Sequence, residues 1–168
     1  METSKEPDLR ALARVLGEAA IPYALIGGVA LQVHQREPRT TLDIDVAVGD
    51  RTGLPRDALR RAGFSETGRF EHSENWLAPG GTPVQFTDDR AFREALARTI
   101  TVPLQDVVLR VLAPRDLLAA KLRAAKDPAR RRSKRLQDLA DVQALLEQEP
   151  ALEVALSSED RALLQRLP

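Results

Sequence analysis

The sequence predicts an α/β fold in which strands and helices alternate at first and the last third of the chain is helical. Apolar residues recur at helical spacing in some segments and at alternate positions in others, and the two kinds of segment alternate up to residue 112. From Pro114 onward the helical spacing prevails. Hydrophobic residues make up 43% and charged residues 30% of the 168-residue chain, a composition typical of a folded protein.

The first part of the chain is expected to alternate helix and strand. Leu9, Leu12 and Leu16 lie on one face of an amphipathic helix, and the segment 42–48 alternates apolar with acidic residues, as a half-buried strand does. Gly63 follows the last helical residue of this part, as expected for a helix end. In chain order we expect a helix over 8–20, a strand over 23–26, a helix over 29–35, a strand over 42–48 and a helix over 53–62.

The middle of the chain is expected to be mostly extended, and the end helical. The Ala-Pro-Gly-Gly sequence at 78–81 is typical of a turn between two strands, and Pro114 suits a first helical turn. We expect strands over 64–70, 74–77, 82–87, 100–104 and 107–112, a helix over 92–98, and an exposed bend over 127–133 within the final helices. The chain is therefore expected to form a core over 1–112 and a helical extension over 113–168 that packs on it.

Composition narrows the class of protein. The chain has no cysteine, and its N-terminus lacks a signal-peptide pattern. Pro22, Gly27, Gly28 and Gln32 interrupt the longest apolar run, 19–33, so we expect no membrane span and a cytoplasmic protein. The net charge is zero, but residues 121–135 hold eight basic residues and one acid, whereas residues 147–168 hold five acids and two bases.

The most informative motif is a glycine pair, Gly27-Gly28, followed by Asp43 and Asp45. A glycine pair between a strand and a helix exposes backbone N–H groups to which phosphate can bind, because no Cβ blocks the approach. Two aspartates spaced i, i+2 on a strand face the same side, where their charges repel unless a cation lies between them. Mg²⁺ prefers such oxygen ligands. The combination indicates phosphoryl or nucleotidyl transfer.

Each of these residues also has a structural interpretation. The glycines fit a tight turn that needs a positive φ, and the aspartates fit the solvated face of an edge strand. Arg39 either binds phosphate or pairs with a nearby acid. The hydroxyl of Thr41 orients a carboxylate, or Thr41 is present because a β-branched side chain suits a strand.

The motif as a whole resembles a known family. Its residues in order are Gly27, Gly28, Arg39, Thr41, Asp43 and Asp45. It resembles the minimal nucleotidyltransferase fold of the DNA polymerase beta superfamily, and within it the bacterial AbiEii-type nucleotidyltransferase toxins, over residues 21–146. The resemblance implies a mixed sheet, a nucleoside triphosphate substrate, and Mg²⁺ or Mn²⁺ held by Asp43 and Asp45. It also implies transfer of a nucleoside monophosphate to an acceptor hydroxyl, with RNA such as a tRNA end as one acceptor class, an antibiotic as another, and a cognate antitoxin as a partner.

One position departs from the family pattern. Catalytic members carry a third carboxylate on a neighbouring strand, where this chain has Gln85. Glutamine can ligate a metal through its carbonyl oxygen, but it cannot act as a general base. Four explanations stay open: Glu74, Asp88 or Asp89 supplies the acid, with Glu74 preferred; one metal suffices; catalysis is weak; or the chain is a non-catalytic module that binds nucleotide or a partner protein.

The final helices carry the second part of the resemblance. There the family uses a lysine that reaches the triphosphate and an aspartate of the catalytic centre, and the matching residues are Lys121 and Asp138. Asp141 lies one turn further along the same face, and we expect a helix-surface or capping role for it. The alternative for all three is that they flank an ordinary apolar core stripe.

The remaining candidates are surface and core residues. The arginine cluster of the expected bend either grips an RNA backbone or is a solvated bend. Its members are Arg130, Arg131, Arg132 and Arg135. His34 and His72 have no partner at ligand spacing, and Tyr23 and Trp76 are expected in the core.

Overall fold

The computed structural model describes residues 5–36 and 40–166. The chain divides into two compact units, the first made of Met1–Ala30 and Arg39–Leu112, the second of Leu31–Pro38 and Ala113–Pro168. Most contacts of each unit are made within that unit.

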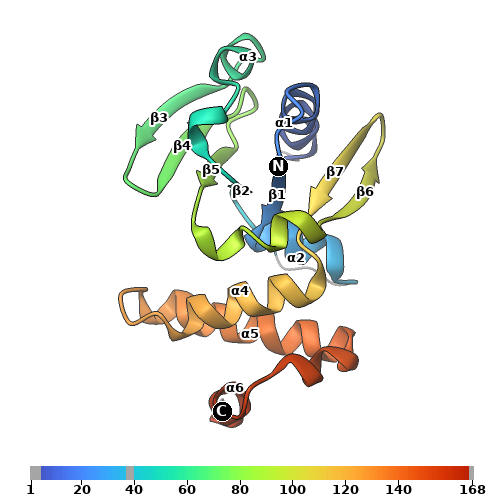
Figure 1. Cartoon of the computed structure of the whole chain (residues 1–168), viewed down its shortest axis with the longest axis vertical. Coiled ribbons are helices and arrows are strands. Elements are labelled where there is room, and N and C mark those ends of the chain that lie inside the picture. The colour runs from blue at the N-terminus through green and yellow to red at the C-terminus, as the bar shows by residue number, and fades with distance from the viewer. Residues whose placement is uncertain (1–4, 37–39, 167–168) are drawn as a thin grey trace. The chain divides into compact units, whose positions relative to one another are not determined.

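The first unit is built on a mixed seven-stranded sheet in the order β3-β4-β5-β2-β1-β7-β6 (Figure 1). β1 runs antiparallel to β2 and parallel to β7, and β2 runs parallel to β5. The expected α/β fold class with a mixed sheet is therefore confirmed. The strands are β1 (Tyr23–Ile26), β2 (Ile44–Val48), β3 (Ser65–Arg69), β4 (Ser73–Leu77), β5 (Pro83–Thr87), β6 (Ile100–Leu104) and β7 (Val107–Val111).

Helices α1 (Glu6–Glu18) and α3 (Arg56–Arg61) belong to this unit. α1 has proline in its first turn, buries Leu12 and Leu16 completely, and contacts β7 and α3. Asp8, in the same first turn, is also buried. Its two carboxylate oxygens accept hydrogen bonds from the backbone N–H groups of Gly80 (2.8 Å) and Thr82 (3.1 Å), in the turn between β4 and β5.

The pairing register assigns each strand residue to one of the two sheet faces, because directly paired residues point the same way. Val46 on β2 pairs with Phe86 on β5, which in turn pairs with Glu74 on β4. All three side chains lie on a buried face of the sheet. Trp76 lies on that face too and is 1% exposed, as expected for a core residue; Tyr23 is also buried.

Two of the expected helices differ in the structure. The helix expected over 53–62 begins only at Arg56, after the short 3-10 helix η1 (Arg51–Gly53). The helix expected over 92–98 is replaced by two 3-10 helices, η2 (Arg90–Phe92) and η3 (Ala95–Arg98). Asp50 and Asp89 accept hydrogen bonds from backbone N–H groups two residues ahead. Such local bonds stabilise a tight turn in place of an α-helical turn.

The second unit is helical. Its elements are α4 (Pro114–Lys126), α5 (Arg132–Gln148), the 3-10 helix η4 (Pro150–Ala155) and α6 (Ser158–Gln165), which begins with a capping box between Ser157 and Asp160. α4 and α5 bury an apolar stripe that includes Leu118, Leu122 and Val142. Helix α2 (Gly27–His34) begins in the first unit, and its residues from Leu31 onward belong to the second. Among the described residues, no helix is both long and apolar enough to span a bilayer.

Candidate active site

The Gly27-Gly28 turn, where β1 ends and α2 begins, lies directly against the acidic motif. Gly27 has φ +62°, a conformation that favours glycine. A Cβ on Gly27 would lie 2.5 Å from Asp45 Oδ2, and a Cβ on Gly28 would lie 2.5 Å from Thr41 Oγ1. The structural interpretation of the pair is therefore correct, since the turn needs a positive φ and two close approaches. Phosphate binding by the same turn stays a prediction.

Asp43 and Asp45 flank the first residue of β2. Asp43 is exposed just before the strand, and Asp45 is half-buried as its second residue. The buried Thr41 hydroxyl donates to Asp43 Oδ1 over 3.2 Å, and Lys5 Nζ donates to the Thr41 carbonyl oxygen. Of the two interpretations of Thr41, the hydrogen bond supports the one in which its hydroxyl orients a carboxylate. Arg39 lies outside the described residues.

A row of oxygen-bearing side chains continues from Asp45 across the sheet. Asp45 pairs with Gln85 on β5, and Gln85 pairs with Asn75 on β4, so all three face the same side. Gln85 is exposed beside Asp45. Adjacent strands lie about 4.8 Å apart, so the Gln85 amide can reach a cation held by Asp45.

The prediction that Glu74 supplies the missing third carboxylate is wrong. Glu74 pairs with Phe86 and therefore points to the opposite face of the sheet from Asp45. It is completely buried, and its carboxylate accepts hydrogen bonds from Arg56 Nη2 (2.7 Å) and Trp76 Nε1 (3.0 Å). Burial raises the pKa of Glu74, but these hydrogen bonds and the nearby arginine charges outweigh it and leave that pKa below its usual value. Glu74 therefore has a structural role, as the buried partner of Arg56 and Trp76.

The other two acids proposed as substitutes have local partners. Asp88 forms an ion pair with Arg51 Nε at 3.1 Å, and Asp89 caps η2. Within residues 5–36 and 40–166 no cluster of three or more His, Cys, Asp or Glu side chains is placed to hold a metal ion.

The available oxygen donors are nevertheless suitable for Mg²⁺. Two carboxylates, Asp43 and Asp45, and the Gln85 amide oxygen form a hard, oxygen-only set. Mg²⁺ usually keeps several waters and takes one or two protein carboxylates together with substrate phosphates. The residues present therefore fit a cation that arrives with a triphosphate, and they do not form a complete protein cage.

The second unit contains a buried charged cluster between α4 and α5. Lys121 Nζ lies 2.7 Å from Asp141 Oδ2 and 3.2 Å from Asp138 Oδ1, and all three residues are buried. Arg130 Nε donates to the other oxygen of Asp138 (2.7 Å), and Gln137 Nε2 donates to Asp141. The helix-surface role expected for Asp141 is wrong, because an oppositely charged partner on α4 makes its burial tolerable. Its spacing of three residues from Asp138 was the available signal.

The arginine cluster is only partly available to a partner. Besides the bond from Arg130 to Asp138, Arg135 Nε donates to the Ala125 carbonyl oxygen (2.9 Å). Arg131 and Arg132 are exposed at the start of α5, which begins at Arg132, inside the range expected to form the bend.

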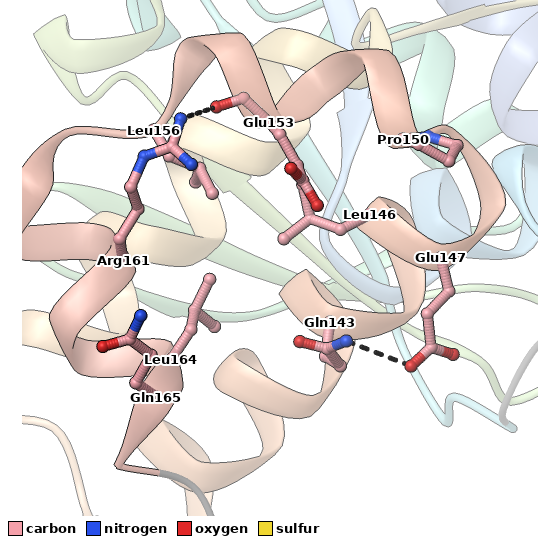
Figure 2. A pocket seen from close by; sticks show the side chains of 9 residues that line it. All are labelled: Gln143, Leu146, Glu147, Pro150, Glu153, Leu156, Arg161, Leu164 and Gln165. Carbon is pink, nitrogen blue, oxygen red and sulfur yellow. Dashed lines mark hydrogen bonds between the residues drawn. The ribbon is translucent and has the colours of Figure 1, made fainter.

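The second unit also contains a pocket of about 440 Å³, and none of the candidate residues lines it (Figure 2). Its apolar lining includes Leu146, Leu156 and Leu164, and its polar lining includes Glu147, Glu153 and Arg161. Arg161 donates to the backbone oxygen of Glu153, and Gln143 donates to Glu147.

Comparison with known proteins agrees with this geometry. The mixed sheet, with a glycine turn packed against Thr41 and Asp45, is the fold of solved nucleotidyltransferase structures. The chain belongs to the family of nucleotidyl transferase AbiEii toxins of type IV toxin–antitoxin systems, whose model matches residues 10–167. No curated protein matches the sequence significantly.

Solved structures share the fold at low sequence identity. An antigenic nucleotidyltransferase-like protein from Paracoccidioides brasiliensis is 21% identical, with a TM-score of 0.62 and coverage of 97% of this chain and 88% of that one. The antibiotic-resistance factor ANT(2'')-Ia is 14% identical, with a TM-score of 0.64 and coverage of 98% and 97%. The Megavirus polyadenylate synthase is 16% identical, with a TM-score of 0.56 and coverage of 89% and 33%.

Proposed function

We propose that this protein transfers a nucleoside monophosphate from a nucleoside triphosphate to an acceptor hydroxyl, with Mg²⁺ or Mn²⁺ as cofactor, in a toxin–antitoxin setting. The observation that supports it most is the direct packing of the Gly27-Gly28 turn against Thr41 and Asp45. This packing places the start of α2, where backbone N–H groups can bind phosphate, next to Asp45 of the acid pair. Transfer of a phosphoryl group requires both kinds of group at one place.

In this proposal, different residues of the first unit bind the cation and the phosphates. When bound, the divalent cation would neutralise the triphosphate and stabilise the charge that develops on it. Asp43 and Asp45 hold that cation, and the Thr41 hydroxyl fixes the Asp43 carboxylate. The N–H groups at the start of α2 face the phosphates. A bond forms between the acceptor oxygen and the α-phosphorus, the bond from the α-phosphorus to the bridging oxygen breaks, and pyrophosphate leaves.

The proton of the attacking hydroxyl goes to an aspartate of the pair or to water, because the Gln85 amide does not take it up at neutral pH. A dedicated general base contributes about 10²–10⁴-fold to a rate. We therefore expect slower turnover than in relatives with a third carboxylate.

Lys121 and Asp138 enter the proposal through the family resemblance. The ammonium of Lys121 carries three donors, and two of them face Asp138 and Asp141. We propose that Lys121 binds the triphosphate and that Asp138 orients its ammonium. RNA contact by Arg131 and Arg132, and an antitoxin partner, are proposed on the same family grounds.

A second candidate function is a nucleotide-binding module without turnover. Gln85 in place of the third carboxylate favours it, since this substitution removes the residue type that serves as base in the family pattern. RNA and a small antibiotic hydroxyl are the two acceptor classes, and the solved complex of ANT(2'')-Ia with adenylyl-2''-tobramycin illustrates the second for that protein.

The test combines two aspartate variants with ligand binding and transfer. Asp43→Asn and Asp45→Asn should abolish both the rise in Tm on adding Mg²⁺ and nucleoside triphosphates and the transfer of labelled nucleotide to cellular RNA or tobramycin. Without ligand their Tm should stay level or rise, because one of two repelling carboxylates is gone. Asp57→Asn, an exposed carboxylate on α3, is the control and should retain both responses. Binding that depends on both aspartates without any transfer would favour the non-catalytic module.

A further inference from the structure

Helix α5 of the second unit carries its charges in the order that its own dipole disfavours. Its first turn holds Arg132 and Lys134 and no acid, and its last turn holds Glu147 and no basic residue. A helix has a partial positive charge at its N-terminus and a partial negative charge at its C-terminus, so both ends are unfavourable. Two copies of this helix that lie side by side in opposite directions bring each end next to charges of the opposite sign.

One exposed face of α5 runs from its basic end to its acidic end. Leu136, Ala140, Gln143 and Glu147 are all exposed, and their spacing of four, three and four residues places them on one side of the helix. Leu136 is 48% exposed although it is a large apolar residue. Ala140, in the middle of this face, has a small side chain, which allows a second helix to approach closely.

The acidic end of this face opens into the pocket of the second unit. Gln143 and Glu147 line the pocket together with three leucines and a second acid, Glu153 (Figure 2). Leu136 lies seven residues before Gln143, which is about 10 Å along the helix on the same side, and does not line the pocket of its own chain. An exposed apolar side chain and an apolar pocket therefore lie at the two ends of one helix face.

This face is complementary to itself. When two α5 helices run antiparallel and meet at Ala140, Leu136 of each copy lies beside Gln143 of the other, at the mouth of its pocket. Arg132 of each copy then lies opposite the last turn of the other, which contains Glu147. A two-fold arrangement of this kind forms each contact twice, as isologous interfaces do.

We infer that this face of α5, with its pocket, binds a second copy of the chain as an antiparallel dimer. A second copy fits better than an unrelated protein, because the groups that suit the acidic, apolar end occur at the matching distance on the same face. One helix face and one pocket form a small interface, so we expect association in about the micromolar range. The dimer covers Arg132, so the RNA contact proposed for Arg131 and Arg132 requires the dimer to dissociate.

The inference is tested by the oligomeric state of the full chain, without metal or triphosphate. Sedimentation velocity from about 1 to 500 μM protein at low salt should show a monomer–dimer equilibrium, and added salt should weaken it because the charges are exposed. Leu136→Ala should weaken dimerisation by about 10-fold or more, since its apolar contact is lost twice. Val108→Ala truncates another apolar residue, 56% exposed on β7, and should dimerise as the wild type does.

Charge reversal tests the arrangement of the two copies. Arg132→Glu and Glu147→Arg each place like charges opposite one another twice in the dimer, and each should weaken dimerisation about 10- to 100-fold. An equimolar mixture of the two variants should dimerise again, because both contacts of the mixed dimer join opposite charges. Asp57→Arg, at an exposed acid of α3, is the control and should retain the Kd of the wild type.

Three results overturn the inference. They are a wild type that stays monomeric over the whole concentration range, dimerisation that both charge reversals leave unchanged, and a mixture of the two reversed variants that stays monomeric. Thermal unfolding of each variant verifies that it is folded. The proposed function is judged separately, by transfer of nucleotide and by the aspartate variants, and its failure leaves the sedimentation result intact.

Discussion

Replacing either glycine of the Gly27-Gly28 turn by alanine should damage the proposed site without removing any of its polar side chains. Alanine at Gly27 must adopt φ +62°, which costs about 1–2 kcal/mol. The smaller conformational freedom of the unfolded chain offsets about 0.4–1 kcal/mol of this. In addition, a methyl group 2.5 Å from Asp45 Oδ2 displaces that carboxylate.

Alanine at Gly28 acts through Thr41. The new Cβ would lie 2.5 Å from Thr41 Oγ1 and 2.6 Å from Thr41 Cβ, so the backbone of this segment has to shift as well as the side chain. Overpacking of this kind costs about 1–3 kcal/mol. The hydrogen bond from Thr41 to Asp43 is lost with the shift, which adds about 0.5–1.5 kcal/mol. For a chain of this size each kcal/mol lowers Tm by about 2–4 °C.

The chain contains a matched control for each change. Gly81 has φ +92° and nothing within 4 Å of its Cβ position, so Gly81→Ala carries the backbone strain of Gly27→Ala without the displaced carboxylate. Gly17 lies in α1 with open space around it, so Gly17→Ala should be neutral or stabilise the helix by up to about 1 kcal/mol.

The assay is thermal unfolding with and without Mg²⁺ and nucleoside triphosphates. Gly27→Ala and Gly28→Ala should lose the ligand-induced rise in Tm, whereas Gly81→Ala and Gly17→Ala should keep it. A full ligand-induced rise in Gly28→Ala would refute the reasoning, because the turn would then not support the acid pair.

Three further changes have defined outcomes. Glu74→Gln should destabilise the fold by about 2–4 kcal/mol, because the Arg56 guanidinium loses its buried partner, and should leave triphosphate binding unchanged; urea unfolding measures the first and calorimetry the second. The folded-state pKa of Glu74 is below its usual 4.5, so the ionised carboxylate stabilises the fold fully above about pH 4.5, and this stabilisation disappears as the pH falls through the lowered pKa. Glu74→Gln should therefore lose less stability in acid than the wild type. An equal loss of stability in both proteins on acidification would contradict this. Lys121→Ala should weaken binding of ATP more than of adenosine in titration calorimetry, because an ammonium attracts phosphate; equal losses would indicate a packing defect alone. Gln85→Asp should tighten binding of Mn²⁺ and raise any transfer activity by up to about 10²–10⁴-fold, and unchanged Mn²⁺ affinity would show that β5 does not face the metal.

The sequence was sufficient where a local pattern decides the outcome. The alternation of apolar and acidic residues predicts β2, and the glycine pair predicts the turn against it, because both signals lie in a few consecutive residues. The family resemblance, drawn from the same motif, agrees with the family and the fold found by comparison.

The errors concern pairing between distant segments. Glu74 is close to Gln85 along a hairpin, but only the register assigns it to the opposite face, and a shift of one residue would reverse the assignment. Asp141 resembles a surface residue until Lys121 of the neighbouring helix is placed beside it. A single sequence contains neither the register nor the partner.

The buried carboxylate of Asp8 has a consequence for the order in which the chain folds. It bonds to backbone N–H groups of Gly80 and Thr82, more than seventy residues further along the chain. A contact across so long a loop is entropically costly until other structure has shortened the path between its ends. Until α1 has docked, the turn between β4 and β5 lacks two of its hydrogen-bond acceptors, so its amide protons exchange with solvent more readily. Docking of the first helix and closing of this distant turn are therefore expected to be one late, shared step in the folding of the first unit.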